Sequence, residues 1–324
     1  MEYTTLGRTG VTVSRLCLGC MSYGSSRWRP WVLDEECAKP FFRFALEAGI
    51  TFFDTADMYS LGVSEEVTGR ALREMANRDE IVLATKVFFP MNDRPNMGGL
   101  SRKHVVQACE ASLRRLGVET IDLYQIHRFD GAVPIDESLA ALDLLVHQGK
   151  VRYLGASSGY AWQLMRALSV SERNGWARFV SMQNHYNALY REEEREMMPL
   201  CIAEGLAVIP WSPLARGLLA RPHRESESRA TTRSHNDPYA EKLYGESVDW
   251  SIVDAVERIA RDRGVSMAEV GLAWLLGRPG VTAPIIGATK LEQLESSLRA
   301  VSLDLTADEI AAIDAPYTPK RVQF

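Results

Sequence analysis

Four reactive side chains follow short apolar runs of this sequence: Asp54, Tyr59, Lys86 and His127. A phenol is a poor acid at neutral pH, but a neighbouring ammonium group stabilises the phenolate and makes proton donation easier. The Asp54 carboxylate would keep Lys86 charged in a partly buried place, and His127 would hydrogen-bond and orient a carbonyl oxygen. Together these groups predict that Tyr59 donates a proton to an oxygen that becomes negative as hydride arrives, which is the chemistry of carbonyl reduction.

These residues need a scaffold that brings several strand ends together. Short apolar runs rich in β-branched and aromatic residues alternate with amphipathic stretches of helical length, as expected for parallel strands buried on both faces. We therefore predict an α/β fold, a (β/α)8 TIM barrel with its active site at the C-terminal strand ends. An open doubly wound sheet is the alternative, but no G-x-G-x-x-G motif follows an early strand. The expected strands are 15–19, 51–54, 81–86, 121–127, 151–156, 179–184, 206–210 and 283–287, and the expected helices include 34–48, 64–75, 101–116, 135–148, 161–173 and 193–204.

Two segments depart from a bare barrel. Residues 1–14 predict a β-hairpin around a Gly-Arg-Thr-Gly turn, which would cap the closed end. Residues 217–246 are polar, interrupted and follow the seventh strand, so we predict a cofactor or substrate loop that closes over a ligand; an idle insertion is the alternative. The whole chain, 1–324, is predicted to be a single domain.

Composition excludes several other classes of protein. The chain has 324 residues, 46% of them hydrophobic and 24% charged, with a net charge of −5. This balance favours a large core and argues against nucleic-acid or anionic-membrane partners, which need clustered Lys and Arg. The N-terminus does not resemble a signal peptide, and no apolar run approaches the roughly 18 residues of a membrane helix, so a cytoplasmic location is expected.

The five cysteines do not predict a disulfide framework, because their number is odd and they are scattered. Cys17 and Cys20 have C-x-x-C spacing, but no second pair or close His follows, so no metal site is predicted.

The reactive segments resemble the motifs of the aldo-keto reductase superfamily. FFDTADMYS-LGVSEEVTGRAL resembles its signature, with Asp54 and Tyr59 in the D-T-A-x-x-Y core, and ATK and IDLYQIHR resemble its lysine and histidine segments. The resemblance extends from Leu6 to about Pro316, and QIHR and PWSPLARGLL are similar to the bacterial and potassium-channel β-subunit-like branches. It implies an NADP(H)-dependent reductase of aldehydes and small ketones, with Tyr59 as the general acid.

The resemblance also implies a site for NADPH. GASS is similar to the family's G-x-S-N, so Ser157, Ser158 and Gln183 would hold the nicotinamide carboxamide, with Ser158 in place of the usual Asn. PWSPLARG places Trp211 on the nicotinamide ring where Tyr is common, and stacking needs only a π face. The other implied cofactor residues are Gly19, Met21, Asp54, Ser212, Leu214, Arg216, Gly217, Gly287, Thr289, Lys290 and Gln293.

The segment IIGATKLEQL resembles the family's adenosine-phosphate segment. A positive Lys290 near the 2′-phosphate would favour NADPH over NADH, and a solvated first-turn lysine is the alternative. The family often has Glu-Asn where this chain has Ser296 and Ser297, so the 2′-phosphate contacts can differ.

Substrate contacts are expected from the loops that follow the first, third and fourth strands. Trp28, Trp31 and Phe88 predict an aromatic wall, with simple loop packing as the alternative, and Tyr23 is expected to contact the substrate. Arg128 could pair with an anionic substrate, although a structural role at a strand end is the alternative. His185 is expected in a loop or wall, and the charge run 191–198 is expected to be a solvated helix face.

Two other functions are compatible with this fold. An NADP(H)-binding regulatory or sensory subunit with weak turnover is one, but the sequence shows no long coiled coil, basic tail or N-terminal arm for a partner. A lyase or isomerase of sugar phosphates is the other, but it lacks an identified base pair and metal cluster. The predicted partner is a small carbonyl substrate, and a homo-oligomer is an open option.

Overall fold

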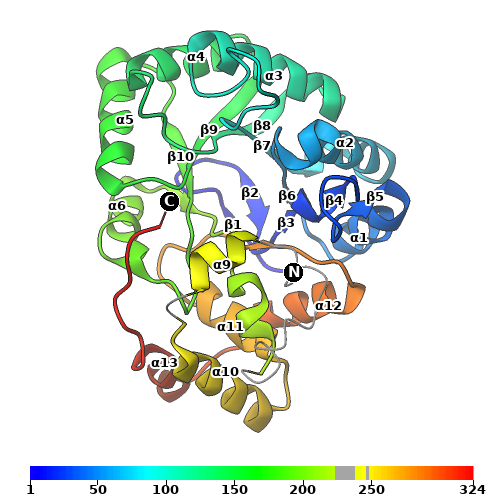
Figure 1. Cartoon of the computed structure of the whole chain (residues 1–324), viewed down its shortest axis with the longest axis vertical. Coiled ribbons are helices and arrows are strands. Elements are labelled where there is room, and N and C mark those ends of the chain that lie inside the picture. Colours follow the sequence, from blue (N-terminus) through cyan, green and yellow to red (C-terminus); the bar gives the residue numbers. More distant parts are fainter. Residues whose placement is uncertain (223–237, 246–247, 324) are drawn as a thin grey trace.

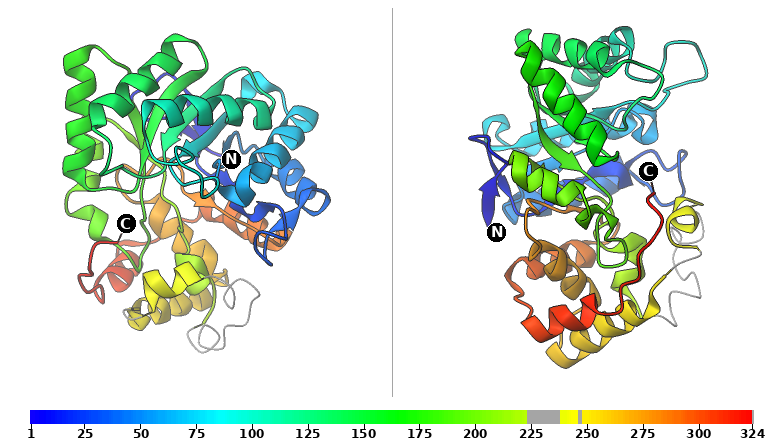
Figure 2. Two further views of the ribbon diagram at one scale, coloured as in Figure 1. Left: turned by 45° about the horizontal axis from the view of Figure 1, so that its top comes forward. Right: turned by 90° about the vertical axis from the view of Figure 1, so that its left-hand side faces the viewer.

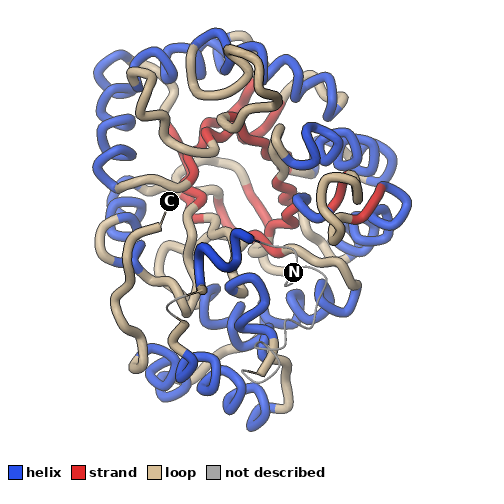
Figure 3. Tube along the Cα trace, viewed as in Figure 1, coloured by secondary structure: helices blue, strands red, loops and turns tan. Residues whose placement is uncertain are grey.

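Eight parallel strands form the centre of the computed structural model, which describes residues 1–222, 238–245 and 248–323. Neighbours in the sheet are neighbours in the sequence, and the last strand returns to pair with the first. A parallel bridge between Val208 and Val281 closes the remaining side, so the strands form the ring seen in Figure 3. The predicted barrel is confirmed and the open doubly wound sheet is wrong. The strands are β3 (Cys17–Gly19), β6 (Phe52–Asp54), β7 (Val82–Val87), β8 (Ile121–Ile126), β9 (Val151–Ser157), β10 (Phe179–Gln183), β11 (Ala207–Val208) and β12 (Ile285–Ile286).

Helices surround this ring (Figure 1). Their ends follow local capping chemistry: Ser101 accepts a hydrogen bond from the backbone N–H of His104 at 3.3 Å at the start of α3, and Gly117 ends that helix with φ +65°. The predicted helix 193–204 is instead divided into a short 3-10 turn, η4, and α6. The helices are α1 (Glu35–Glu47), α2 (Val63–Met75), α3 (Arg102–Leu116), α4 (Ile135–His147), α5 (Ala161–Asn174), η4 (Glu192–Glu194), α6 (Met197–Glu204), α9 (Pro238–Tyr244), α10 (Trp250–Arg263), α11 (Met267–Leu276), α12 (Leu291–Arg299) and α13 (Ala307–Asp314).

A β-hairpin covers one end of the barrel, as the sequence predicts. Its strands, β1 (Tyr3–Thr5) and β2 (Thr12–Ser14), pair antiparallel. Leu6 and Val13 are fully buried against barrel residues that include Phe52. Each such side chain stabilises the fold by about 1.5–3 kcal/mol. Figure 2 shows the hairpin and α9 on opposite sides of the ring, so the hairpin leaves the other mouth open for a ligand.

The predicted loop 217–246 contains regular structure where the chain is described. A 3-10 segment, η5 (Ala215–Ala220), overlaps its start, and α9 lies near its end. That the loop closes over a ligand stays a prediction. Residues 223–237 and 246–247 of this prediction lie outside the described residues. No helix in the described part of the chain is both long and apolar enough to cross a membrane.

The charge run 191–198 is not a solvated helix face. Glu192 and Glu193 are buried. The Tyr317 hydroxyl and the Lys320 backbone N–H each donate to Glu192, at 2.8 and 2.7 Å. Arg191 pairs with Glu194 and with Asp314 at 2.8 Å. The run therefore anchors the C-terminal segment to the barrel.

Candidate active site

A cavity of about 1390 Å³ lies at the C-terminal ends of the barrel strands. Typical small-molecule pockets have about 300–1,000 Å³, so this one is large enough for a dinucleotide and a second small molecule. Asp54, Tyr59 and His127 line it. Lys86 lies behind this surface and is completely buried.

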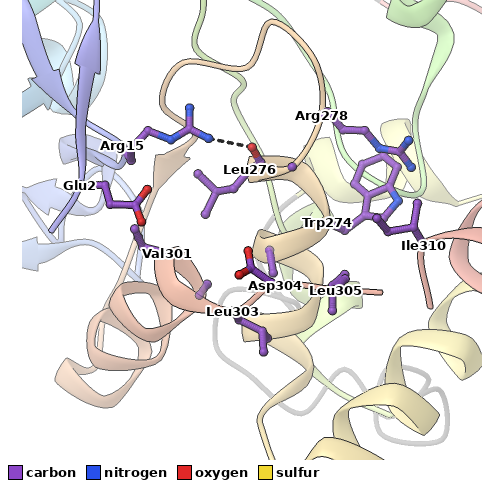
Figure 4. Close-up of a pocket in the computed structure, with 13 residues that line it drawn as sticks. Glu2, Arg15, Trp274, Leu276, Arg278, Val301, Leu303, Asp304, Leu305 and Ile310 are labelled. Atoms are coloured by element: carbon purple, nitrogen blue, oxygen red, sulfur yellow. Dashed lines mark hydrogen bonds between the residues drawn. The ribbon is translucent and has the colours of Figure 1, made fainter. Parts of the chain in front are cut away.

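A second cavity of about 230 Å³ contains none of these reactive residues. Figure 4 shows Arg15 at its edge, donating to the carbonyl oxygen of Leu276 at 2.7 Å. Arg15 also donates to the carbonyl oxygens of Val281 and Thr282. Satisfying these backbone groups explains the arginine structurally, so we place the active site in the larger cavity.

Lys86 joins the other ionisable groups of the site. Its Nζ donates to Asp54 Oδ2 at 2.5 Å and to the Thr55 carbonyl oxygen at 2.7 Å, and it lies 3.4 Å from the Tyr59 hydroxyl. Gln125 and Gln183 donate to Asp54 Oδ1 at 2.9 and 3.0 Å. Both oxygens of the Asp54 carboxylate are thus satisfied, and the carboxylate holds Lys86 next to the phenol.

The surroundings set the charge of Lys86. Burial by itself would lower its pKa, but the Asp54 carboxylate and the Tyr59 phenol together outweigh burial, and the pKa is raised above its usual value. The ammonium therefore stays protonated although it is shielded from water, and it faces the phenol oxygen of Tyr59.

His127 is held as a neutral ring. Burial, helped by the charges of Lys86 and Arg128, lowers its pKa well below the usual value. Its ring lies edge-on to Tyr59, with centroids 5.8 Å apart, and edge-on to Phe89 at 4.9 Å. A neutral imidazole can donate one hydrogen bond to a carbonyl oxygen without competing as the acid.

Backbone strain gathers around this cavity. Six of the seven non-glycine residues with positive φ in the described chain follow Tyr59 or lie at residues 158 and 212–216. Such conformations cost of order 1–3 kcal/mol each and persist where the surrounding structure enforces them. The turn after Tyr59, with Ser60 at φ +50° and Leu61 at φ +51°, returns the chain to α2 and leaves the phenol at the cavity wall.

The residues expected at the nicotinamide end lie together. Ser157, Ser158, Gln183 and Trp211 all line the cavity. The Trp211 indole N–H donates to the Ser158 hydroxyl at 3.0 Å, so the two departures from the common family residues form one contact. The Gln183 side-chain nitrogen is committed to Asp54 and Gln125, which leaves its oxygen for a carboxamide.

His185 lies behind this wall and not in the cavity. It is fully buried between Tyr190 and Trp211, and each ring pair has centroids 4.3 Å apart. Its Nε2 lies 2.6 Å from the Tyr244 hydroxyl of α9. His185 thus supports the face of Trp211 from within the wall, where the sequence analysis expected it.

The residues expected at the pyrophosphate also line the cavity: Ser212, Leu214, Arg216 and Gly217. A Cβ at Gly217, where φ is +99°, would lie 2.7 Å from Arg221 Nη2. Arg221 lines the cavity, and its Nη1 is buried without a hydrogen-bond partner among the described residues. Sequence reasoning missed Arg221, which stands beyond the matched PWSPLARG segment.

The adenosine end is built around the start of α12. Gly287, Thr289, Lys290 and Gln293 line the cavity. The Gln293 side-chain oxygen accepts from the backbone N–H groups of Thr289 and Lys290 at 2.9 and 3.2 Å, so it caps the helix. Lys290 is exposed and forms no ion pair with a described residue. Ser296 and Ser297 of α12 also line the cavity. Gly19, which ends the first barrel strand, and Met21, which follows that strand, line it as well.

The structure places four of the five residues predicted at the substrate pocket in the cavity: Trp28, Trp31, Phe88 and Arg128. Tyr23 is the exception, and its prediction is wrong. It is fully buried, and its ring packs on Phe41 and Phe42 of α1 at 5.4 and 5.2 Å. The β4 (Tyr23–Gly24) and β5 (Leu33–Asp34) pairing directs the ring into this helix contact.

Several cavity residues were missed by the sequence analysis. Phe89 follows Phe88 directly, so the tandem aromatic was the available signal. Phe129 follows Arg128, and Met58 precedes Tyr59. Tyr239 comes from α9 and had no local signal. All four line the cavity. Among the described residues, no cluster of three His, Cys, Asp or Glu side chains could hold a metal ion.

Comparison with known proteins gives consistent matches. The profile of the aldo/keto reductase family matches residues 15–317. Versiconal hemiacetal acetate reductase of Aspergillus parasiticus is 43% identical, over 99% of this chain and 98% of that protein. A Schizosaccharomyces pombe protein with the provisional name aryl-alcohol dehydrogenase is 43% identical over 99% and 97%. An aldo-keto reductase of Fusarium vanettenii is 43% identical over 100% and 93%.

Proposed function

The chain belongs to the aldo/keto reductase family of oxidoreductases, and on that premise we propose that it reduces an aldehyde or small ketone with NADPH. The observation that carries this proposal is the position of Lys86 between Asp54 and the Tyr59 hydroxyl, at 2.5 and 3.4 Å, behind a cavity large enough for both reactants.

The cavity residues suit a phosphorylated dinucleotide. Trp211 offers a flat face, and Ser157 and Gln183 offer hydroxyl and amide groups. Arg221 has a buried nitrogen with no hydrogen-bond partner among the described residues, which can serve an anion. When bound, NADPH supplies the hydride that adds to the carbonyl carbon. The exposed ammonium of Lys290 would hold the 2′-phosphate, which supports a preference for NADPH over NADH.

The protein's own groups handle the oxygen and its proton. His127, held neutral, donates a hydrogen bond that orients the carbonyl oxygen. Tyr59 transfers its phenolic proton to that oxygen, and the Lys86 ammonium stabilises the phenolate that is left. Asp54 keeps Lys86 charged throughout. These groups act on charge that develops during the reaction, which is where stabilisation raises the rate.

The alternative is a cofactor-binding regulatory subunit with weak turnover. The three relatives named above are fungal, and two of their names describe reductases, which supports catalysis over regulation. Membership of the bacterial and potassium-channel β-subunit-like branch stays a prediction from the QIHR and PWSPLARGLL segments. A cytoplasmic location, the exclusion of nucleic-acid and membrane partners, and a homo-oligomer also stay predictions.

The substitution Tyr59→Phe tests the proposed acid. It removes one oxygen at the cavity wall, so we expect NADPH oxidation with a reactive aldehyde to fall by about 10²-fold or more, while the Kd for NADPH measured by fluorescence changes by less than about threefold. Tyr3→Phe is the matched control, because Tyr3 is 52% exposed and belongs to the hairpin at the closed end. Unchanged turnover in Tyr59→Phe would refute the assignment.

A further inference from the structure

The cavity is basic although the protein is acidic. The chain has a net charge of −5, yet the described residues of the cavity wall include two acidic side chains, Asp54 and Glu292, and Asp54 is already neutralised by Lys86. Its basic side chains are Arg29, Arg128, Arg216, Arg221, Lys242 and Lys290. A surface of this sign attracts anions. Arg216 and Lys290 lie in the segments assigned to the cofactor phosphates, and Arg221 follows the first of these segments. The other basic side chains are left to be explained.

Arg128 belongs to neither of those segments. It follows His127 directly at the end of β8, and the Phe89 ring contacts both residues. The ring centroid is 4.9 Å from that of His127 and 5.5 Å from the Arg128 guanidinium carbon. One aromatic ring therefore contacts both the guanidinium and the imidazole that orients the carbonyl oxygen.

The guanidinium has no acidic partner in the described part of the chain. Its polar contacts go to two uncharged oxygens, the His127 carbonyl at 2.5 Å and the Tyr239 hydroxyl at 3.5 Å. A guanidinium carries five N–H donors in a planar fork that matches a carboxylate. Two arginines with structural roles have more partners. Arg15 donates to three backbone carbonyls, and Arg191 pairs with two carboxylates.

The cavity that Arg128 lines has aromatic walls. The rings of Phe88 and Phe89 lie edge-on to each other with centroids 5.2 Å apart, and Phe129 and Trp28 line the same cavity. Such walls favour a flat apolar ring. A single guanidinium balances one negative charge, which suits a carboxylate better than a phosphate dianion.

We propose that the substrate is an aryl aldehyde or aryl ketone bearing a carboxylate, whose carboxylate pairs with Arg128 while its carbonyl oxygen meets Tyr59 and His127. This inference rests on the proposed function, because it assigns the substrate class of the same site. Arg128 is then a specificity-determining residue, and Tyr239 of α9 completes the carboxylate site through its hydroxyl group.

The test compares 4-carboxybenzaldehyde and 3-carboxybenzaldehyde with their methyl esters, using NADPH oxidation to measure kcat/KM. The ester has nearly the same shape without the charge, and it withdraws electrons more strongly, so a preference for the acid cannot be electronic. We expect the wild-type protein to prefer the acid in the better isomer by about 10- to 100-fold, the range for a charge-assisted bidentate contact. Arg128→Met should bring this ratio to about one, and Arg128→Lys should restore part of it.

Arg261→Met is the matched control. It removes the same charge from an exposed position on α10 and should keep the wild-type ratio. If the wild-type protein reduces the esters and the acid-to-ester ratio of kcat/KM is one or below, the inference is overturned and the proposed function stays intact. A high ratio that survives Arg128→Met would also overturn it. Failure to reduce any of the four aldehydes would refute the proposed function and this inference together.

Discussion

Replacing Asp54 by Asn tests whether the buried pair organises the site. Lys86 is 0% exposed and Asp54 only 2%, so the variant leaves a buried ammonium without its counter-charge. The amide oxygen can still accept from Gln125 and Gln183, but the new NH2 group then faces the Lys86 ammonium, donor against donor. Breaking a buried pair in this way costs about 3–5 kcal/mol, a large part of the roughly 5–15 kcal/mol that stabilises a typical domain.

The pH dependence of this variant has a defined sign. In the wild-type protein the pKa of Lys86 is raised above the ordinary lysine value of 10.5, so the pair's stabilisation is complete below that value and is lost only as the pH rises through the folded-state pKa. Without Asp54, burial dominates and lowers the pKa. The unfolded chain then binds more protons than the folded one in the alkaline range below 10.5, so the variant becomes more stable as the pH rises.

Urea denaturation at pH 7, 8 and 9 measures both effects. We expect the free energy of unfolding of Asp54→Asn to lie about 3–5 kcal/mol below wild type at pH 7 and the gap to narrow toward pH 9. Asp262→Asn is the control, because Asp262 is 66% exposed and its pairing with Arg261 is weak at 3.7 Å. An Asp54→Asn variant as stable as wild type, or a gap that widens with pH, would refute the role assigned to the buried pair.

Two further predictions concern the cofactor wall and a buried acid. Ser158→Ala removes the acceptor of the Trp211 indole N–H, a bond worth about 0.5–1.5 kcal/mol, and we expect the Kd for NADPH in a fluorescence titration to rise by about two- to tenfold; an unchanged Kd would mean that this bond does not orient Trp211. Burial raises the pKa of Glu193 from 4.5 to about 8, so the folded state holds a proton that the unfolded chain releases, and stability falls as the pH rises across that window. Glu193→Gln should therefore gain stability relative to wild type between pH 5 and pH 9 in urea denaturation, and a constant difference would contradict the raised pKa.

Much of the barrel could be predicted because its determinants are local. Apolar runs of strand length are buried on both faces in a parallel sheet, and β7 and β8 are buried at every position. Lys86 lies within β7 and His127 directly follows β8, so their placement at the cavity follows from the strand assignment and the rule that barrel sites form at C-terminal strand ends. The strand containing residues 207 and 208 is shorter than predicted, because the barrel closes there by a single bridge and backbone hydrogen bonds to Thr282 and Ala283.

The wrong predictions for Tyr23 and for the charge run 191–198 share a different cause, which is contact between segments far apart in the chain. Tyr23 has the right type and position for a pocket wall, but α1 supplies Phe41 and Phe42 to bury it. The run at Glu192 has the composition of a solvated face, yet its partner Tyr317 lies 125 residues away. No window of sequence contains both members of such a pair.

The sequence by itself determined the alternation of strands and helices, the capped helix ends and the order of the reactive residues, because each depends on a short stretch of chain. Tertiary structure alone decided how those residues meet. Lys86 reaches Asp54 and Tyr59 across 32 and 27 positions, and the Trp211 indole binds Ser158 across 53. The basic cavity also belongs to the folded molecule, since its cations come from separate strand ends and helices and only barrel closure collects them around one aromatic space.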